Sequence, residues 1–185
     1  MKEQYYLISQ LPAFSMEQGG ELPVSWNSFL ELCSRFLPAK DFDALSSLSL
    51  EPDFYSGKTG YAALDKWNEY EKSLRYVLAG IRAGKLKKEF NMDAAGIFPG
   101  GISQEVINTA GTAAGFKNPL EAEIYLCEAG ARFAESLAGF DIFSLDNVFA
   151  YGIRLRLAER IRLFNEEAGI ESYKKIYDQI LGETK

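Results

Sequence analysis

One residue type that is common in active sites, histidine, is absent from this sequence. The absence of histidine excludes Ser–His and Cys–His nucleophile pairs in their usual form, histidine-ligated zinc and iron sites, and histidine general bases. Carboxylates, lysines and tyrosines are present and could still serve an enzyme. The composition therefore favours a protein that binds other molecules over a hydrolytic enzyme.

One stretch ends like a nucleotide-binding P-loop, namely Ser56-Gly57-Lys58-Thr59. The complete motif needs a glycine five residues before Gly57, and Pro52 stands at that position. No β-strand is predicted ahead of the stretch either. Without the glycine turn, the backbone N–H groups cannot wrap phosphate oxygens. We predict a polar loop here rather than a nucleotide site.

Carboxylates and cysteines could hold a metal ion, but neither set completes a known site. A di-metal site in a helical bundle usually needs a Glu-x-x-His pair, which a chain without histidine lacks. We expect Glu128 and Glu135 to face solvent, and we expect no metal or cofactor. The two cysteines, Cys33 and Cys127, are too few for a zinc site and lie in apolar helical patterns. We therefore expect buried, reduced thiols.

A cluster of basic residues at the end of a predicted helix is a candidate for partner binding. It consists of Arg82, Lys85, Lys87 and Lys88. Cations at this place complement the partial negative charge of a helix C-terminus, which would leave them solvated. The alternative is a docking surface for an acidic partner.

A second set of arginines lies along one predicted helix, with Arg154 and Arg162 as candidates for partner contacts. Arginine is favoured at protein interfaces, although an exposed arginine-rich face is the simpler interpretation. Arg156 and Glu159 are three residues apart and could form a partly buried ion pair that fixes the helix register. If the arginines bind a partner, reversing the charge of Arg154 and Arg162 should weaken binding and leave thermal stability nearly unchanged.

The elements that position these residues are predicted to be helices. With 185 residues, of which 47% are hydrophobic and 25% charged, the chain suits one globular domain. We predict a mainly α fold, a multi-helix bundle with a small, partly extended N-terminal element. Residues 1–60 would form an N-terminal lobe of helices and loops, and residues 61–185 the core of the bundle.

The N-terminal lobe is predicted to combine an aromatic segment with two short helices. Residues 5–9 suit an edge strand or an extended arm. Within them, Tyr5 and Tyr6 could pack in the core or form an exposed docking element. Ser25 is expected to cap a helix that runs to about residue 37, and Asp41 to cap a short helix through residue 48.

Five further helices are predicted from apolar periodicity and capping residues. They span about residues 61–83, 103–114, 119–138, 145–168 and 171–181. The helix over 145–168 carries apolar residues on two sides and should lie at the centre of the bundle. One side holds Leu145, Val148, Phe149, Leu155 and Leu163, and the other Ile153, Leu157, Ile161 and Phe164. In the last helix we expect Tyr173, Ile176, Tyr177 and Ile180 to face inward.

The net negative charge and the hydropathy pattern of the sequence argue against nucleic acid and membranes as partners. The formal net charge is −6 and the pI about 4.9, so no overall affinity for nucleic acid or anionic lipid is expected. No apolar run approaches the roughly 20 residues that cross a bilayer, and we expect no membrane insertion. The first residues lack the apolar core of a signal peptide, and we expect a cytoplasmic protein.

Several stretches of the sequence carry a resemblance to a known family. Phe140 to Tyr151, Leu155 to Arg160 and Asn165 to Gly169 resemble the C-terminal helices of the C-type subunit of A/V-type rotary ATPases. That subunit is the helical socket between the membrane rotor and the central stalk. Upstream, the stretches Trp67 to Glu71, Leu74-Arg75 and Leu78 to Ala83 look like a long helix with an arginine pair in that kind of protein.

The resemblance to the C-type subunit is confined to about residues 61–83 and 140–181, and a second resemblance covers most of the chain. Tyr5 to Ile8, Leu11-Pro12 and Phe29 to Cys33 are similar to a bacterial family of uncharacterised proteins associated with V-type ATPases. This resemblance implies a non-enzymatic structural or assembly component that binds stalk or rotor subunits, in the cytoplasm or peripheral to the membrane through its complex. The alternatives are a free-standing helical adaptor with an unrelated partner and, less favoured, a small-molecule enzyme that uses carboxylate or tyrosine chemistry.

Overall fold

The computed structural model describes residues 2–17, 21–52, 54, 57–90, 98, 100–164 and 176. Over these residues the protein is mainly helical and has no β-strand, which confirms the predicted fold class. No helix of this part is long and apolar enough to span a membrane. The helices are α1 (Lys2–Ser9), α2 (Trp26–Ser34), α3 (Ala39–Ser46), α4 (Ala62–Lys85), α6 (Gln104–Gly115), α7 (Pro119–Ser136) and α8 (Leu145–Leu163).

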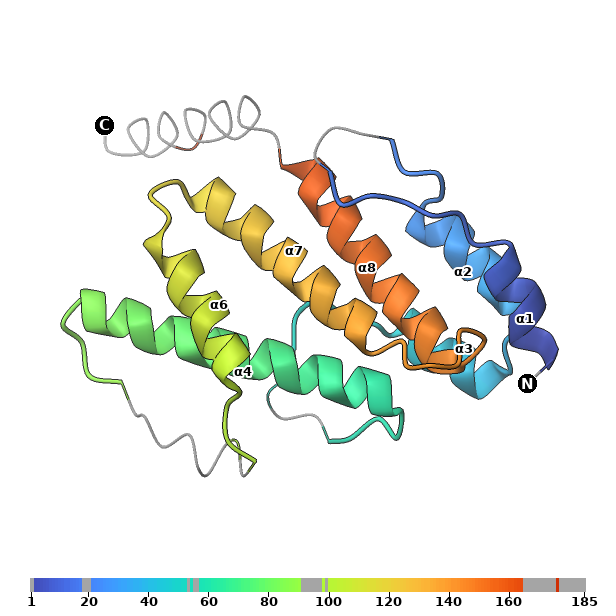
Figure 1. The fold of residues 1–185 in the computed structure, drawn as a ribbon, viewed down its shortest axis with the longest axis horizontal. Coiled ribbons are helices and arrows are strands. Elements are labelled where there is room, and N and C mark those ends of the chain that lie inside the picture. Colours follow the sequence, from blue (N-terminus) through green and yellow to red (C-terminus); the bar gives the residue numbers. More distant parts are fainter. Residues whose placement is uncertain are drawn as a thin grey trace.

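Helix α8 lies at the centre of this arrangement (Figure 1). It packs against α7 on one side and also contacts α4 and α2. Helix α6 packs on α4 and α7, while α2 and α3 pair with each other. The N-terminal helices therefore cover the flank of α8 that α7 leaves open.

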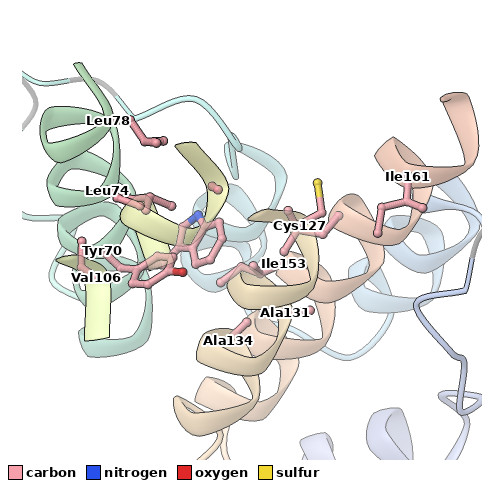
Figure 2. Close-up of a cluster of buried hydrophobic side chains, with 13 residues drawn as sticks. Tyr70, Leu74, Leu78, Val106, Cys127, Ala131, Ala134, Ile153 and Ile161 are labelled. Atoms are coloured by element: carbon pink, nitrogen blue, oxygen red, sulfur yellow. The ribbon is translucent and has the colours of Figure 1, made fainter. Parts of the chain in front are cut away.

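Two clusters of buried side chains meet on α8. The first joins α8 to α4, α6 and α7 (Figure 2), and the second joins it to α1, α2, α3 and the start of α4. Ile153, Leu157 and Ile161 of α8 belong to the first cluster, and Val148, Phe149 and Leu155 to the second. The predicted two-sided helix is thereby confirmed. Leu163 is the exception, since it is 81% exposed at the end of α8.

Side-chain caps begin four of the helices. Ser25, Ser103, Asn118 and Ser144 each accept a hydrogen bond from a backbone N–H in the first turn, which satisfies a donor that lacks a partner within the helix. The predicted cap at Asp41 is wrong. The carbonyl of Pro38 accepts from the amides of Asp41 and the next residue, so α3 begins earlier and Asp41 lies in its first turn.

Residues 5–9 are helical, contrary to the predicted strand or arm. In this helix Leu7 and Ile8 pack into the second cluster, with Leu7 completely buried, and Leu11, which follows the helix, packs against the same cluster. A strand would split Leu7 and Ile8 between two faces. The non-helical part of this element is the segment 11–17, which we call the N-terminal strap.

Some predicted helix ends differ from the structure or lie outside its described part. Helix α2 ends at Ser34 rather than near residue 37. The predicted continuation of α8 over 165–168 falls outside the described residues. So does most of the predicted helix 171–181. Ile176 is described, and it is helical but 56% exposed, so its predicted inward orientation is wrong.

Candidate functional site

A groove between α4, α7 and α8 is the strongest candidate for a binding site. It encloses about 250 Å³. Its floor is apolar, because Leu74, Leu78 and Leu157 are almost fully buried beneath it. Its charged residues come from three helices and are Glu71, Arg75 and Arg82 of α4, Glu123 of α7 and Arg160 of α8. We call this site the α4–α7–α8 groove.

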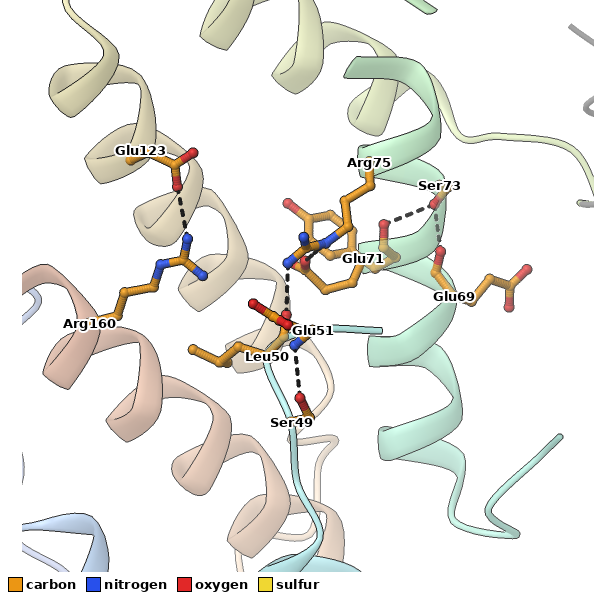
Figure 3. Close-up of polar contacts among 10 residues, drawn as sticks. Ser49, Leu50, Glu51, Glu69, Glu71, Ser73, Arg75, Glu123 and Arg160 are labelled. Atoms are coloured by element: carbon orange, nitrogen blue, oxygen red, sulfur yellow. Dashed lines mark hydrogen bonds and ion pairs between the residues drawn. The ribbon is translucent and has the colours of Figure 1, made fainter. Parts of the chain in front are cut away.

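Two ion pairs lie on opposite sides of the groove (Figure 3). On one side, Arg75 Nε donates to Glu71 Oε2 at 3.3 Å, and Arg75 Nη2 donates to the carbonyl oxygen of Leu50 at 3.0 Å. On the other side, Arg160 Nη2 donates to Glu123 Oε2 at 3.2 Å and so links α8 to α7. Each pair balances its own charge within the groove wall.

Arg82 is the charged residue of the groove without a counter-ion. Its guanidinium has no hydrogen-bond or ion-pair partner among the described residues, and the side chain is exposed at the end of α4. Three arginines face two glutamates in the groove, which leaves one positive charge. The groove is therefore suited to an anion more than to a cation.

Glu71 is the titratable group that the groove perturbs most clearly. Burial raises the pKa of its carboxyl above the ordinary value of 4.5, and the repulsion of Glu123 acts in the same direction. Arg75 and Arg160 lower this pKa, but burial is the largest effect. The folded protein therefore retains the Glu71 proton at pH values where the unfolded chain has already lost it.

A Glu71→Gln variant should gain stability relative to the wild type as the pH rises above 4.5. Since the folded-state pKa is raised, the wild type loses free energy of unfolding as Glu71 ionises in the groove. The variant has no charge to bury. Urea unfolding of both proteins across the acidic to neutral range measures the difference. Glu69→Gln, at an exposed position of the same helix, is the control, and an equal pH trend in both variants would contradict the assignment.

The predicted basic cluster is divided by the structure. Arg82 lines the groove, whereas the Lys85 ammonium donates to the carbonyl oxygen of Ala114 and so links α4 to the end of α6. Lys87 and Lys88 follow α4 and are exposed, with Lys87 in the left-handed backbone region at φ 52°. All four side chains are exposed, but Lys87 and Lys88 neither line the groove nor bond to another helix among the described residues, and they stay candidates for an acidic partner.

Arg154 and Arg162 contact the N-terminal strap instead of forming an open arginine face. The guanidinium of Arg154 lies 5.4 Å from the ring centre of Phe14, and its Nη1 is 3.8 Å from Glu135 Oε1. Arg162 Nη2 donates to the carbonyl oxygen of Ser15 at 3.3 Å. These two arginines therefore attach the strap to α8.

Reversing both charges, as Arg154→Glu with Arg162→Glu, should lower the free energy of unfolding by about 1–2 kcal/mol. The double variant loses the cation–π contact with Phe14 and the bond to Ser15, and it places negative charge near the C-terminus of α8. This expectation replaces the nearly unchanged stability predicted from the sequence. Urea unfolding measures it. Lys58→Glu with Lys117→Glu is a matched control, because both lysines are exposed and the net charge change is equal.

The predicted ion pair between Arg156 and Glu159 is present, with Nη1 and Oε2 3.6 Å apart. Glu159 Oε1 also accepts from the backbone N–H of Trp26 at 2.7 Å, and the Arg156 guanidinium lies 5.3 Å from the Trp26 ring centre. The pair thus places the start of α2 against α8, in agreement with a role in fixing the packing of α8.

Exposed aromatic and aliphatic side chains gather where α1 meets the loop before α8. Tyr5 and Tyr6 are 50% and 62% exposed, Ile142 is 61% exposed, and Phe140 is fully exposed. The Tyr5 ring lies 4.7 Å from that of Phe143 in the same loop, which brings α1 and the loop together. We call this surface the aromatic end. Tyr5 and Tyr6 are therefore exposed rather than packed in the core, and their role in docking stays a prediction.

The cysteines and the P-loop-like stretch, which could in principle carry chemistry, have no feature of an active site among the described residues. Both cysteines are buried free thiols, and burial raises the pKa of Cys33 to about 12 and that of Cys127 to about 11. In the P-loop-like stretch, the N–H and hydroxyl of Thr59 both donate to Asp65 Oδ1 at 2.7 Å. The amide and hydroxyl of Thr59 are therefore already bonded to a carboxylate. Within the described part of the chain, no group of metal-ligating residues comes together.

The groove combines residues that sequence reasoning did not bring together. Glu71 and Arg75 were visible as a pair four residues apart on one helix. Arg160 and Glu123 are 37 residues apart, and their pairing depends on how α7 packs on α8. The sequence did contain one indication of the groove. Charged residues lie beside an apolar stripe on one face of α4, in the order Glu71, Leu74, Arg75, Leu78 and Arg82.

Comparison with known proteins gives no relative: no family model, curated protein or solved structure matches this chain.

Proposed function

We propose that this protein is a non-enzymatic structural or assembly component of a bacterial A/V-type rotary ATPase, resembling its C-type subunit. In this role it binds protein subunits of the central stalk or rotor. The proposal is supported by the sequence resemblance over residues 61–83 and 140–181, and by a surface of the kind that such a component needs.

The observation that carries the proposal is the aromatic end. Four large apolar side chains are exposed on α1 and on the loop that Tyr5 contacts through Phe143, those of Tyr5, Tyr6, Phe140 and Ile142. Exposed apolar side chains on neighbouring segments are typical of interaction sites, and aromatic residues are enriched at protein interfaces. Phe140 and Ile142 also belong to the stretch that resembles the socket protein of the rotary ATPases.

Affinity purification of the tagged protein from its native cell, with mass spectrometry of the co-purifying proteins, tests the proposal. We expect catalytic, stalk or rotor subunits of the ATPase to be recovered. A Phe140→Ser/Ile142→Ser variant should lose them, because the apolar contacts at the aromatic end are removed. The fold should be unaffected, since both side chains are exposed.

The matched control is Phe54→Ser with Leu86→Ser, two exposed apolar residues that belong neither to α1 nor to the loop before α8. This variant should recover the same subunits as the wild type. Recovery of none of them from cells that contain the assembled ATPase would contradict the proposal. An unrelated protein recovered in stoichiometric amount would favour the free-standing adaptor instead.

A further inference from the structure

The α4–α7–α8 groove has the features of a small-molecule site that the proposed protein contacts do not use. Leu74, Leu78 and Leu157 supply an apolar floor, each less than a tenth exposed. The ion pairs Glu71–Arg75 and Glu123–Arg160 form charged walls that are already neutral. Among the described residues that line the groove, the charge without a counter-ion is that of the exposed Arg82.

We propose that this groove binds a small organic monoanion, with a carboxylate at Arg82 and an apolar chain over the leucine floor. A guanidinium presents parallel N–H donors that match the two oxygens of a carboxylate. Ligand sites in proteins are commonly apolar cavities in which a few polar groups fix the orientation of the ligand. The groove has this composition.

Size and charge narrow the class of ligand. The cavity of about 250 Å³ lies below the roughly 300–1,000 Å³ of sites for drug-sized molecules, so the ligand is small. The single net positive charge of the described groove residues matches a ligand with a single negative charge. An organic cation would meet Arg82 without a free counter-ion, and a purely inorganic anion would leave the leucine floor in contact with water.

Isothermal titration calorimetry on the full chain at neutral pH tests the inference with hexanoate as the probe. We expect saturable binding of hexanoate, and binding of hexanamide and of inorganic phosphate weaker by about tenfold or more. Hexanamide keeps the chain and removes the charge, whereas phosphate keeps the charge and removes the chain. The proposal needs both parts.

Two variants locate the site within the groove. Arg82→Gln should weaken hexanoate binding by about tenfold or more. Ala79→Leu, at an exposed position that lines the groove, should abolish binding by filling the cavity without a change of charge. Lys88→Gln removes an exposed cation that does not line the groove, and it should bind hexanoate as the wild type does.

Several results would overturn the inference. Absence of a saturable hexanoate signal up to about 10 mM would overturn the inference, because a dissociation constant above that concentration is too weak for a specific site. Equal binding of hexanoate and hexanamide would rule out the role of Arg82. Equal effects of Arg82→Gln and Lys88→Gln would indicate a diffuse charge effect rather than this groove. Loss or retention of ATPase subunits in the purification experiment does not affect any of these results.

Discussion

Replacing Gly152 with leucine is expected to lower the free energy of unfolding by about 3 kcal/mol or more. Gly152 lies on α8 where α2 and α3 pack against it. A Cβ atom built on this glycine would stand 3.2 Å from Leu45 Cδ1, 3.2 Å from Phe29 Cε1 and 3.4 Å from Trp26 Cζ3. Leucine adds further carbon atoms to a space that these three side chains already fill, so α2 and α3 must move away from α8.

Gly111→Leu is the matched control for this prediction. Gly111 lies in α6, and a Cβ atom there would meet nothing within 4 Å. Since leucine is a better helix former than glycine, this variant should be neutral or stabilised by up to about 1 kcal/mol. Chemical denaturation of the two variants and the wild type gives the comparison. Equal stability of the two variants would mean that α2 and α3 do not pack on Gly152 as the structure has them.

Local features of the chain were predictable from the sequence because they depend on neighbouring residues. Ser25, Asn118 and Ser144 act as helix caps through bonds to amides two or three residues on, and such spacings can be read directly. The two apolar sides of α8 follow in the same way from a period of 3.6 residues. These observations were sufficient for the fold class.

Features that depend on tertiary packing were not predictable from the same observations. The sequence placed Arg154 and Arg162 on the helix with two apolar sides, but it did not show what these arginines would contact. Arg162 contacts Ser15, 147 residues away, and this contact decides that the arginine holds the strap. The groove likewise requires the positions of three helices. Residues 5–9 were misassigned because a short apolar run suits either a strand or a helix, and the second cluster selects the helix.

The structure places one tryptophan in each half of the molecule, which makes the coupling between the two buried clusters measurable. Trp67 lies in the cluster of α4, α6, α7 and α8, and Trp26 packs against the cluster of α1, α2 and α3. Both clusters include side chains of α8, so loss of α8 packing in one cluster should be transmitted to the other. Two-state unfolding of the whole domain is the expected consequence.

A Phe149→Ala variant is expected to lower the free energy of unfolding by about 3–5 kcal/mol. Phe149 is completely buried in the second cluster, with its ring 5.2 Å from that of Tyr61. The substitution leaves a cavity beside α8. Urea unfolding followed by fluorescence, in proteins that keep only Trp26 or only Trp67 through Trp→Phe substitution, should show the same loss with both probes.

The comparison between the two probes decides whether α8 joins the halves into one cooperative unit. Phe149 belongs to the cluster near Trp26, so a purely local effect would shift the Trp26 transition and leave that of Trp67 in place. Coincident shifts are expected instead, because Ile153, four residues after Phe149 on α8, is completely buried in the cluster of Trp67. Separate transitions would contradict a single cooperative domain and would divide the chain into two units that fold independently.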